Sequence, residues 1–416
     1  MGAALIVDVD GTLTHDAGDA VAPERAAALE RLRASAASVT LVSNGSRERT
    51  RLLAEAHGVD FLDTRHRKPS RRVLETFSAA GSPVYMLGDK VLTDGLFAAN
   101  IGARFVPVSR IRHENDMRAT RATYLLDDLT RPVMRLLMPV LPAVTLMRPT
   151  QWIKNLLVFA PIFFAGDLRP GQLALAAAAF AIFSLAASVV YIVNDLSDRA
   201  TDRLHPSKRF RALASGAVGE RSALALAIML GALVAAGLLF VPALAWVVGA
   251  YLVGNALYSR GLKRVAVVDV SLVALFYVLR VVAGGVATAT FVSPWIILCV
   301  FFGALFLALG KRRTEYISAT KRTVREMYTR ESIDLFVGLS AVLAIISYGI
   351  YSVLGAHSPL AVYSTVLVFA AIARVCNGIF RTDGDAEYPE SLVFRDRWAL
   401  ALTALWAAFM LWLLFR

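Results

Sequence analysis

Three aspartates stand close together near the middle of the chain. Asp195, Asp198 and Asp202 are spaced i, i+3 and i+7, so on a helix they share one face. Carboxylates this close repel one another unless cations lie between them, and Mg²⁺ bridging a diphosphate meets that need, because it takes a few carboxylates together with substrate oxygens. The alternative interpretation is that the three aspartates lie at a solvated helix end and only support the helix. The spacing predicts three catalytic, metal-binding aspartates, and Asn194, directly before them, is expected to contact substrate.

A second pair of carboxylates follows the first apolar run of the chain. Residues 8–12 read DVDGT, so Asp8 and Asp10 stand two positions apart at the end of a predicted strand. There, both can point into the crevice where α/β sheets place their ligands. One carboxylate can attack a phosphoryl group while the other donates and accepts a proton.

Polar residues at three later positions complete this second pattern. Ser43 and Asn44 are suited to binding phosphate oxygens, and Lys68 offers a cation to offset the charge at the nucleophile. Asp89, with Asp94 nearby, offers a magnesium ligand. Together these residues predict a phosphoryl-transfer site.

The elements that must position these residues divide the chain. Residues 1–110 alternate predicted strands with helical stretches such as 25–34, which indicates an α/β domain with a parallel sheet and helices on both sides. The predicted strands are residues 4–9, 39–43 and 84–87. Residues 111–140 carry scattered arginines and are predicted to form a basic linker or an interfacial helix on an anionic leaflet. Residues 141–416 are dominated by long apolar runs.

Nine apolar runs are long enough to cross a bilayer, which takes about 17–25 residues each. They lie at residues 150–167, 172–194, 222–240, 242–258, 269–288, 292–310, 333–354, 359–380 and 398–415, and Lys154 and Pro161 interrupt the first. Lysines and arginines concentrate in every second loop, so the positive-inside rule predicts a multi-pass inner-membrane protein with the N-terminal domain and these loops in the cytoplasm and the C-terminus outside. The net charge of +12 follows from this topology, and no soluble basic face indicates nucleic-acid binding.

The ordered motifs of residues 3–108 resemble the haloacid dehalogenase (HAD) superfamily, most of all its capless subclass that includes phosphatidylglycerophosphate phosphatases. The resemblance implies a Rossmann-like fold in which Asp8 is the nucleophile and Asp10 the general acid/base. It also implies the substrate-binding residues Ser43, Asn44 and Lys68 and the metal ligands Asp8, Asp10 and Asp89. A degenerate domain kept for assembly or stability is the alternative.

Residues 194–202 form an NDxxDxxxD signature, and here the chain resembles the UbiA-type prenyltransferase superfamily over about residues 145–416. The resemblance implies an all-α membrane domain of nine transmembrane helices. Where that superfamily has a second acidic motif, this chain has residues 258–264 (YSRGLKR) and a single Asp269. The stretches 148–155 (RPTQWIKN), 205–211 (HPSKRFR), 280–285 (RVVAGG) and 310–312 (GKR) are similar to decaprenyl-phosphate phosphoribosyltransferases, which join 5-phosphoribosyl 1-diphosphate to a polyprenyl monophosphate.

The basic residues of the loops suit substrates with several phosphates. The donor carries a diphosphate and a 5-phosphate and the acceptor a further phosphate, whereas an aromatic acceptor would need fewer cations. Besides Asn194, the predicted substrate-binding residues are Lys154, Asn155, Lys208, Arg209, Arg211, Tyr258, Lys263, Asp269 and Lys311. Anchoring at the membrane surface is the alternative for part of the basic set and for Tyr258.

The leading hypothesis is a Mg²⁺-dependent transferase that moves a phosphoribosyl group from 5-phosphoribosyl 1-diphosphate to a polyprenyl phosphate and carries a fused phosphatase. The alternative is a prenyltransferase that moves a polyprenyl chain from its diphosphate to an aromatic or other polar acceptor. A third reading is a transporter of an anionic lipid, against which the aspartate triple argues, because transporter sites usually lie near the bilayer midplane. The expected partners are the membrane and the two substrates, and a homo-oligomer is compatible with the sequence.

Overall fold

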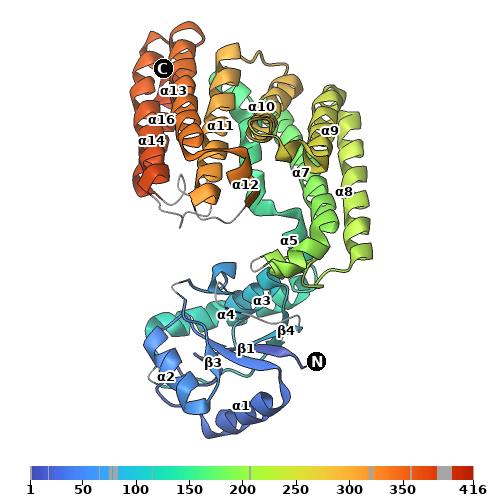
Figure 1. Cartoon of the computed structure of the whole chain (residues 1–416), viewed down its shortest axis with the longest axis vertical. Coiled ribbons are helices and arrows are strands. Elements are labelled where there is room, and N and C mark those ends of the chain that lie inside the picture. The colour runs from blue at the N-terminus through green and yellow to red at the C-terminus, as the bar shows by residue number, and fades with distance from the viewer. Residues whose placement is uncertain are drawn as a thin grey trace. The chain divides into compact units, whose positions relative to one another are not determined.

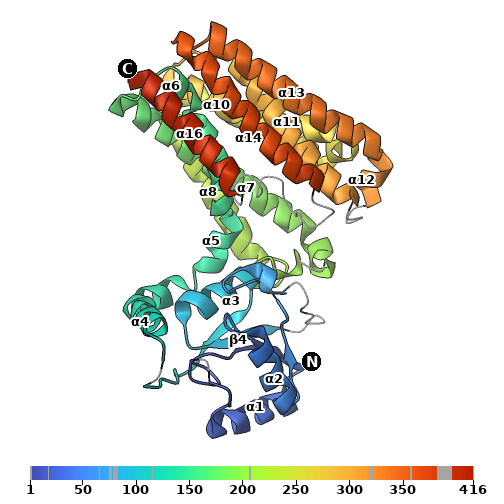
Figure 2. The same ribbon diagram turned by 90° about the vertical axis from the view of Figure 1, so that its left-hand side faces the viewer.

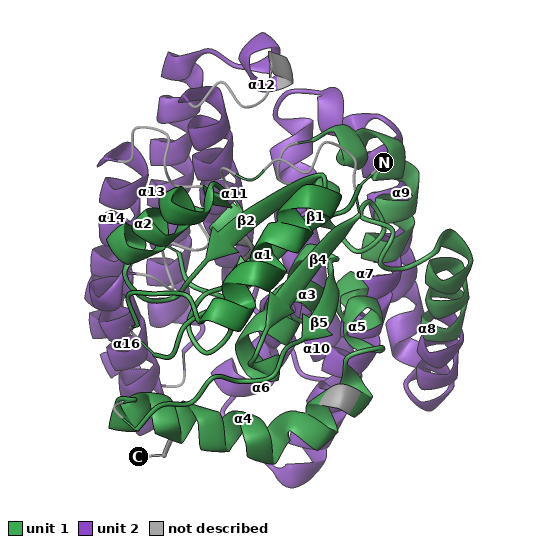
Figure 3. Ribbon diagram, turned by 90° about the horizontal axis from the view of Figure 1, so that it is seen from below, with its two compact units in different colours: residues 1–149, 191–230 green, residues 150–190, 231–416 purple. Residues whose placement is uncertain are grey.

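The structure is a computed structural model that describes most of the chain. The described residues are 2–16, 18–64, 66–74, 77, 83–114, 116–205, 208–317, 322–356, 358–381 and 396–415. Of the motif at 205–211, residues 206 and 207 therefore lie outside the described residues, as do 382–395 of the last predicted basic loop. Two compact units make up the chain, one of residues 1–149 and 191–230 and the other of residues 150–190 and 231–416 (Figure 3).

A five-stranded parallel sheet forms the centre of the N-terminal region in the first unit. Its strands are β1 (Ala4–Asp8), β2 (Ser38–Val42), β3 (Asp60–Phe61), β4 (Val84–Gly88) and β5 (Arg104–Pro107), in the order β3-β2-β1-β4-β5. The three predicted strands and the parallel pairing are confirmed. The sequence pattern missed β3 and β5, because β3 has two residues and β5 is exposed along most of its length.

Alternate residues of β1 are buried in two different hydrophobic cores, one on each face of the sheet. Because both faces are covered, the whole strand is apolar. Leu5 and Val7 pack with helices α1 (Pro23–Ser35) and α2 (Arg47–His57) on one face. Ile6 packs with α3 (Leu96–Ile101) on the other face, in a cluster that also contains Phe210 from the loop after helix α7. The chain runs from β1 toward β3 and then crosses to β4, so the carboxyl ends of β1 and β4 are neighbours at the point where the strand order reverses. Open α/β sheets bind ligands at that point.

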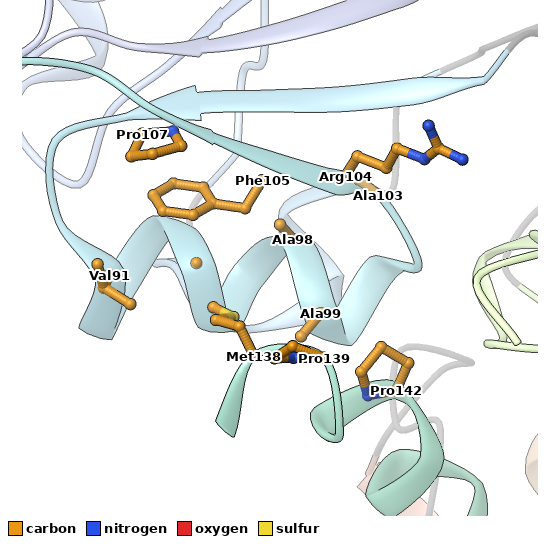
Figure 4. Close-up of a pocket in the computed structure, with 11 residues that line it drawn as sticks. Val91, Ala98, Ala99, Ala103, Arg104, Phe105, Pro107, Met138, Pro139 and Pro142 are labelled. Carbon is orange, nitrogen blue, oxygen red and sulfur yellow. The ribbon is translucent and has the colours of Figure 1, made fainter. Parts of the chain in front are cut away.

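Two helices follow the sheet, α4 (Arg118–Leu137) and α5 (Leu141–Met147). The predicted interfacial segment is thus mainly α4, which exposes Leu125, Leu129 and Leu136 and buries Asp127. An apolar cavity of about 450 Å³ lies where α3 and β5 face the start of α5, and Figure 4 shows the residues that line it. Residues such as Phe105 line it, and none of the predicted site residues does.

Helices of 5 to 35 residues make up most of the rest of the chain. They are α6 (Ala160–Phe164), α7 (Pro170–Leu204), α8 (Glu220–Phe240), α9 (Ala245–Arg260), α10 (Val268–Thr288), α11 (Pro294–Ile317), α12 (Arg322–Met327), α13 (Arg330–Leu354), α14 (Ser364–Arg381) and α16 (Arg397–Phe415). Figures 1 and 2 show α11, α13, α14 and α16 side by side, and α10 also packs on α11. Their shared core includes Leu309, Val337 and Ile379.

Among the described residues, seven helices are long and apolar enough to cross a membrane. They coincide with seven of the nine predicted spans. The first predicted span is instead a 3₁₀ helix, Pro149–Phe159, followed by the five residues of α6, and Lys154 and Pro161 lie within it. The fourth is a 3₁₀ turn, Pro242–Leu244, followed by α9, which is 16 residues long. For these two segments a crossing stays a prediction.

Candidate active sites

Three buried aspartates meet at the carboxyl end of the sheet in the first unit. Asp8 ends β1, Asp89 follows β4, and Asp94 lies in the single π-helical turn Val91–Gly95. One carboxylate oxygen from each lies within 4.8 Å of the other two. Converging carboxylate oxygens are the donor set that Mg²⁺ prefers, so these residues fit a magnesium ion. Asp8 and Asp89 were predicted as ligands, and the fold adds Asp94.

Two glycines make room for these carboxylates. Gly11 has a φ of +86°, and a Cβ there would lie 2.8 Å from the carboxylate of Asp89. A Cβ on Gly88 would overlap the carboxylate of Asp94. The close approach of backbone and carboxylate therefore requires glycine at both positions.

The buried Lys68 lies between two of the aspartates. Its ammonium group donates to Asp8 and, at 2.6 Å, to Asp94. Asn44 fixes the lysine, because its side chain accepts from the Lys68 amide at 2.7 Å and donates to the Lys68 carbonyl at 3.2 Å. Burial and the neighbouring Asp94 raise the pKa of Asp8, and the shared lysine only partly offsets them. Asn44 therefore orients Lys68, and its predicted contact with phosphate oxygens stays a prediction.

Asp10 faces a different set of partners. Its carboxylate accepts from the Ser43 hydroxyl at 2.5 Å and from the guanidinium of Arg49 in the first turn of α2. Burial opposes the charged form, but the bonds from Ser43 and Arg49 outweigh it and lower the pKa of Asp10. The Asp10 side chain does not belong to the three-carboxylate group, so its predicted part in metal binding stays a prediction.

Arg110 is a site neighbour that was not among the predicted site residues. Its guanidinium donates to Asp89 at 2.6 Å and also pairs with Asp127 and Asp128 of α4. These ion pairs fasten α4 to the edge of the sheet that carries the aspartates. The one sequence signal for Arg110 is its position shortly after a strand that ends at the same edge.

The aspartates of α7 also lie in the first unit, where two arginines contact them. Asp195 and Asp202 are 4% and 2% exposed. One Arg211 nitrogen donates to Asp195 at 3.0 Å and to Asp202 at 2.6 Å, and Arg148 donates to Asp195 at 2.6 Å. Asp198 is half-buried, and no hydrogen bond or ion pair reaches it from the described residues. The helix places all three on one face as predicted, with a guanidinium between the first and the third.

Two further basic residues of the loop after α7, Lys208 and Arg209, have different neighbours. The Lys208 ammonium lies 3.8 Å from Asp202. Arg209 instead donates to the carbonyl of Phe77 and stacks on Phe210, within the second core of the sheet. The structure thus brings Lys208 and Arg211 to the aspartates and places Arg209 elsewhere. Arg148, which was seen only as part of a motif, joins them.

The predicted second loop forms a separate ion-pair cluster in the other unit. Asp269 is fully buried and accepts from Arg312 and from the Tyr328 hydroxyl, each at 2.7 Å. The Tyr258 hydroxyl lies 3.5 Å from Arg312. Lys263 is exposed, and Lys311 is half-buried. Arg312 and Tyr328 were not among the predicted site residues, and only the packing of α10, α11 and the α12–α13 connection identifies them.

The 3₁₀ helix Pro149–Phe159 carries the last two predicted residues. Asn155 is buried, donates to Ser184 at 2.9 Å and accepts from Arg280 at 2.7 Å. The Lys154 ammonium lies 5.9 Å from the centre of the Tyr277 ring. Both residues therefore face the aromatic interior of this unit.

Comparison with known proteins adds the family. The model of the UbiA prenyltransferase family matches residues 155–394. A decaprenyl-phosphate phosphoribosyltransferase of Mycobacterium tuberculosis is 36% identical over 68% of this chain and 96% of its own length. The chain belongs to the UbiA prenyltransferase family. A decaprenyl-phosphate phosphoribosyltransferase of Corynebacterium glutamicum is 35% identical over 62% of this chain and 82% of that protein.

Structural comparison agrees with this assignment to the UbiA family. A UbiA homologue from Archaeoglobus fulgidus, solved with GPP and Mg²⁺, has a TM-score of 0.51 at 21% identity and covers 66% of this chain and 98% of its own. The helical region thus has the UbiA fold, and the protein is a multi-pass membrane enzyme of the UbiA type. Residues 3–110 match a model described as mitochondrial PGP phosphatase, which confirms the predicted phosphatase-like domain at the N-terminus.

Proposed function

We propose that this UbiA enzyme transfers a phosphoribosyl group from 5-phosphoribosyl 1-diphosphate to a polyprenyl phosphate and releases diphosphate. The observation that carries the proposal is the close mixture of charges at the end of α7, where Arg211 of the following loop bridges Asp195 and Asp202. Carboxylates alone would suit a metal–diphosphate group, whereas arginine binds phosphate oxygens in pairs. A donor that carries both a diphosphate and a 5-phosphate would be bound by the carboxylates, through the metal, and by the arginine. The two relatives named as decaprenyl-phosphate phosphoribosyltransferases support the same chemistry.

In this proposal Asp195, Asp198 and Asp202 hold Mg²⁺, which neutralises the diphosphate when bound. Arg211 and Arg148 exchange their carboxylate partners for phosphate oxygens of the donor. The bond between ribose C1 and the diphosphate oxygen breaks, and the diphosphate keeps the electron pair. An oxygen of the lipid phosphate then bonds to C1 from the opposite face. Positioning and charge stabilisation account for the catalysis, and no covalent bond to the protein is needed.

The N-terminal domain is assigned phosphatase chemistry on the same lipid. Asp8 attacks the 5-phosphate of the phosphoribosyl product as a carboxylate, the form that Lys68 and a bound Mg²⁺ would favour against the burial that raises its pKa. Asp10 would give a proton to the departing sugar oxygen once the substrate takes over its bonds from Ser43 and Arg49, which now keep its carboxylate charged. It would then accept a proton from the water that hydrolyses the aspartyl phosphate. The donor set of Asp8, Asp89 and Asp94 suits Mg²⁺ at this site.

The proposed location is the inner membrane, with the N-terminal domain and the basic loops in the cytoplasm and the C-terminus outside. The distribution of lysine and arginine supports this orientation. It places both acidic sites on the side where phosphoribosyl donors are made.

The alternative is a prenyltransferase that consumes a polyprenyl diphosphate, as the family description suggests. Purified protein with Mg²⁺, labelled 5-phosphoribosyl 1-diphosphate and a polyprenyl phosphate separates the two. Label in the lipid phase is expected, and later loss of the 5-phosphate from that lipid would identify the phosphatase substrate. Absence of lipid label, together with turnover of polyprenyl diphosphate and an aromatic acceptor, would replace the proposal with the alternative.

A further inference from the structure

One arginine lies in the middle of a membrane-spanning helix. Arg280 is 4% exposed and stands 11 residues after Asp269 on α10, which at 1.5 Å per residue is about 16 Å deeper along the helix. A charged side chain at such depth is costly and usually marks a functional site. Because of this separation, the ion-pair cluster around Asp269 cannot supply a counter-charge to Arg280.

The partners of Arg280 are all uncharged. Its Nε donates to the Asn155 side chain at 2.7 Å, and its Nη1 donates to the Phe276 carbonyl at 2.5 Å. The rings of Phe183, Tyr251 and Tyr277 lie 5.2–5.4 Å from the guanidinium carbon. Within the described residues no carboxylate pairs with Arg280, and Nη2 has no acceptor. Ring contacts attract the charge but do not neutralise it.

Arg313 shows what a structural arginine looks like in the same unit. It is 5% exposed, pairs with Asp334 at 2.7 Å and donates to the Ile379 carbonyl. Arg280 and Arg313 are equally buried, but only Arg313 has a carboxylate partner in the described part of the chain. An anion that is not part of the chain would give Arg280 the counter-charge that Asp334 gives Arg313.

The backbone beside Arg280 is irregular, as it is in many membrane binding sites. Asn155 lies on the 3₁₀ helix Pro149–Phe159, and a Cβ on Gly284 would overlap the carbonyl oxygen of Val158. This segment is therefore pressed against α10 one turn beyond Arg280. Irregular backbone is tolerated at membrane depth where it is buried in protein or lines a cavity, and transporters use broken helices for their substrate sites.

We propose that Arg280, oriented by Asn155 and assisted by Lys154, binds a phosphate group of a substrate inside the membrane-spanning unit. Lys154 supplies a second cation, since its ammonium lies 5.9 Å from the Tyr277 ring that also contacts Arg280. The inference rests on the proposed function, in which the lipid phosphate and the donor 5-phosphate are the two sources of such a group. Arg280 is a binding residue on this account, and Asn155 is a positioning residue.

The test compares binding of a short-chain polyprenyl phosphate and the matching polyprenyl alcohol to the full chain in nanodiscs without donor. Wild type is expected to prefer the phosphate, and Arg280→Gln to weaken phosphate binding at least tenfold with little change for the alcohol. Arg280→Lys should lose less, and Lys154→Gln should lose part of the preference. Arg313→Gln is the matched control, because it removes a buried arginine and should lower Tm without changing the preference.

The donor arm uses binding of 5-phosphoribosyl 1-diphosphate to the same variants. A tenfold loss here, with lipid binding unchanged, would assign the site to the donor 5-phosphate. If Arg280→Gln and Lys154→Gln bind both ligands like wild type, Arg280 is structural and the inference is wrong. Because no turnover is measured, Arg280-dependent binding of the lipid phosphate would stand even if the transfer assay failed.

Discussion

Replacing Arg211 with methionine should strengthen metal binding and weaken catalysis at the same time. One Arg211 nitrogen lies 3.0 Å from an Asp195 oxygen and 2.6 Å from an Asp202 oxygen, so the two oxygens are at most about 5.6 Å apart. Two negative charges about 5 Å apart at an effective dielectric constant of about 20 repel by roughly 3 kcal/mol. The guanidinium now relieves that repulsion, and in Arg211→Met a bound cation would relieve it instead.

The affinity for a divalent ion should therefore rise by up to about 100-fold, because 1.4 kcal/mol corresponds to a factor of ten. Transfer should fall, since the donor phosphate loses a cationic partner. The affinity is measured by electron paramagnetic resonance titration with Mn²⁺ on purified protein that also carries Asp8→Asn, which disables the other candidate metal site. Arg148→Met is the matched control and should gain less, because among the three aspartates of α7 Arg148 contacts Asp195 alone.

Adding Asp202→Asn to Arg211→Met should remove the gain, since one of the two repelling charges is then absent. Unchanged or weaker Mn²⁺ binding in Arg211→Met would refute the reasoning. It would mean that the metal does not lie between these carboxylates.

Further predictions concern the two sites and the helix between them. Asp195→Asn should abolish transfer and keep hydrolysis of p-nitrophenyl phosphate, whereas Asp8→Asn should do the reverse; loss of both activities in either variant would argue for one shared site. Gly88→Ala should lower phosphatase activity at least tenfold with transfer intact, because its Cβ overlaps the carboxylate of Asp94; full phosphatase activity would contradict the close approach. Leu129→Trp should add a tryptophan that brominated lipids in nanodiscs quench in addition to the six native ones, if the exposed apolar face of α4 rests on the bilayer; no quenching beyond that of wild type would remove that role.

Much of this protein could be predicted from local sequence patterns. Short apolar runs indicated the three main strands, and the length of longer apolar runs indicated the seven helices that could cross a membrane. The spacing of Asp195, Asp198 and Asp202 placed them on one helix face, because the period of a helix is fixed by its own hydrogen bonds. Asp8 and Asp89 could be assigned to one crevice since parallel strands end at a common edge. All of these are relations within one element or between adjacent strands.

The partners of the charged residues were decided only by the tertiary structure. Arg110, Arg148 and Arg312 each pair with a predicted aspartate, yet their local sequence does not say which of the aspartates each one contacts in a chain with 44 lysines and arginines. Arg280 and Asn155 are 125 residues apart and meet because Gly284 lets one segment lie against α10. An ion pair depends on the distance between two side-chain ends, and that distance is set by how helices pack, which a local pattern does not contain.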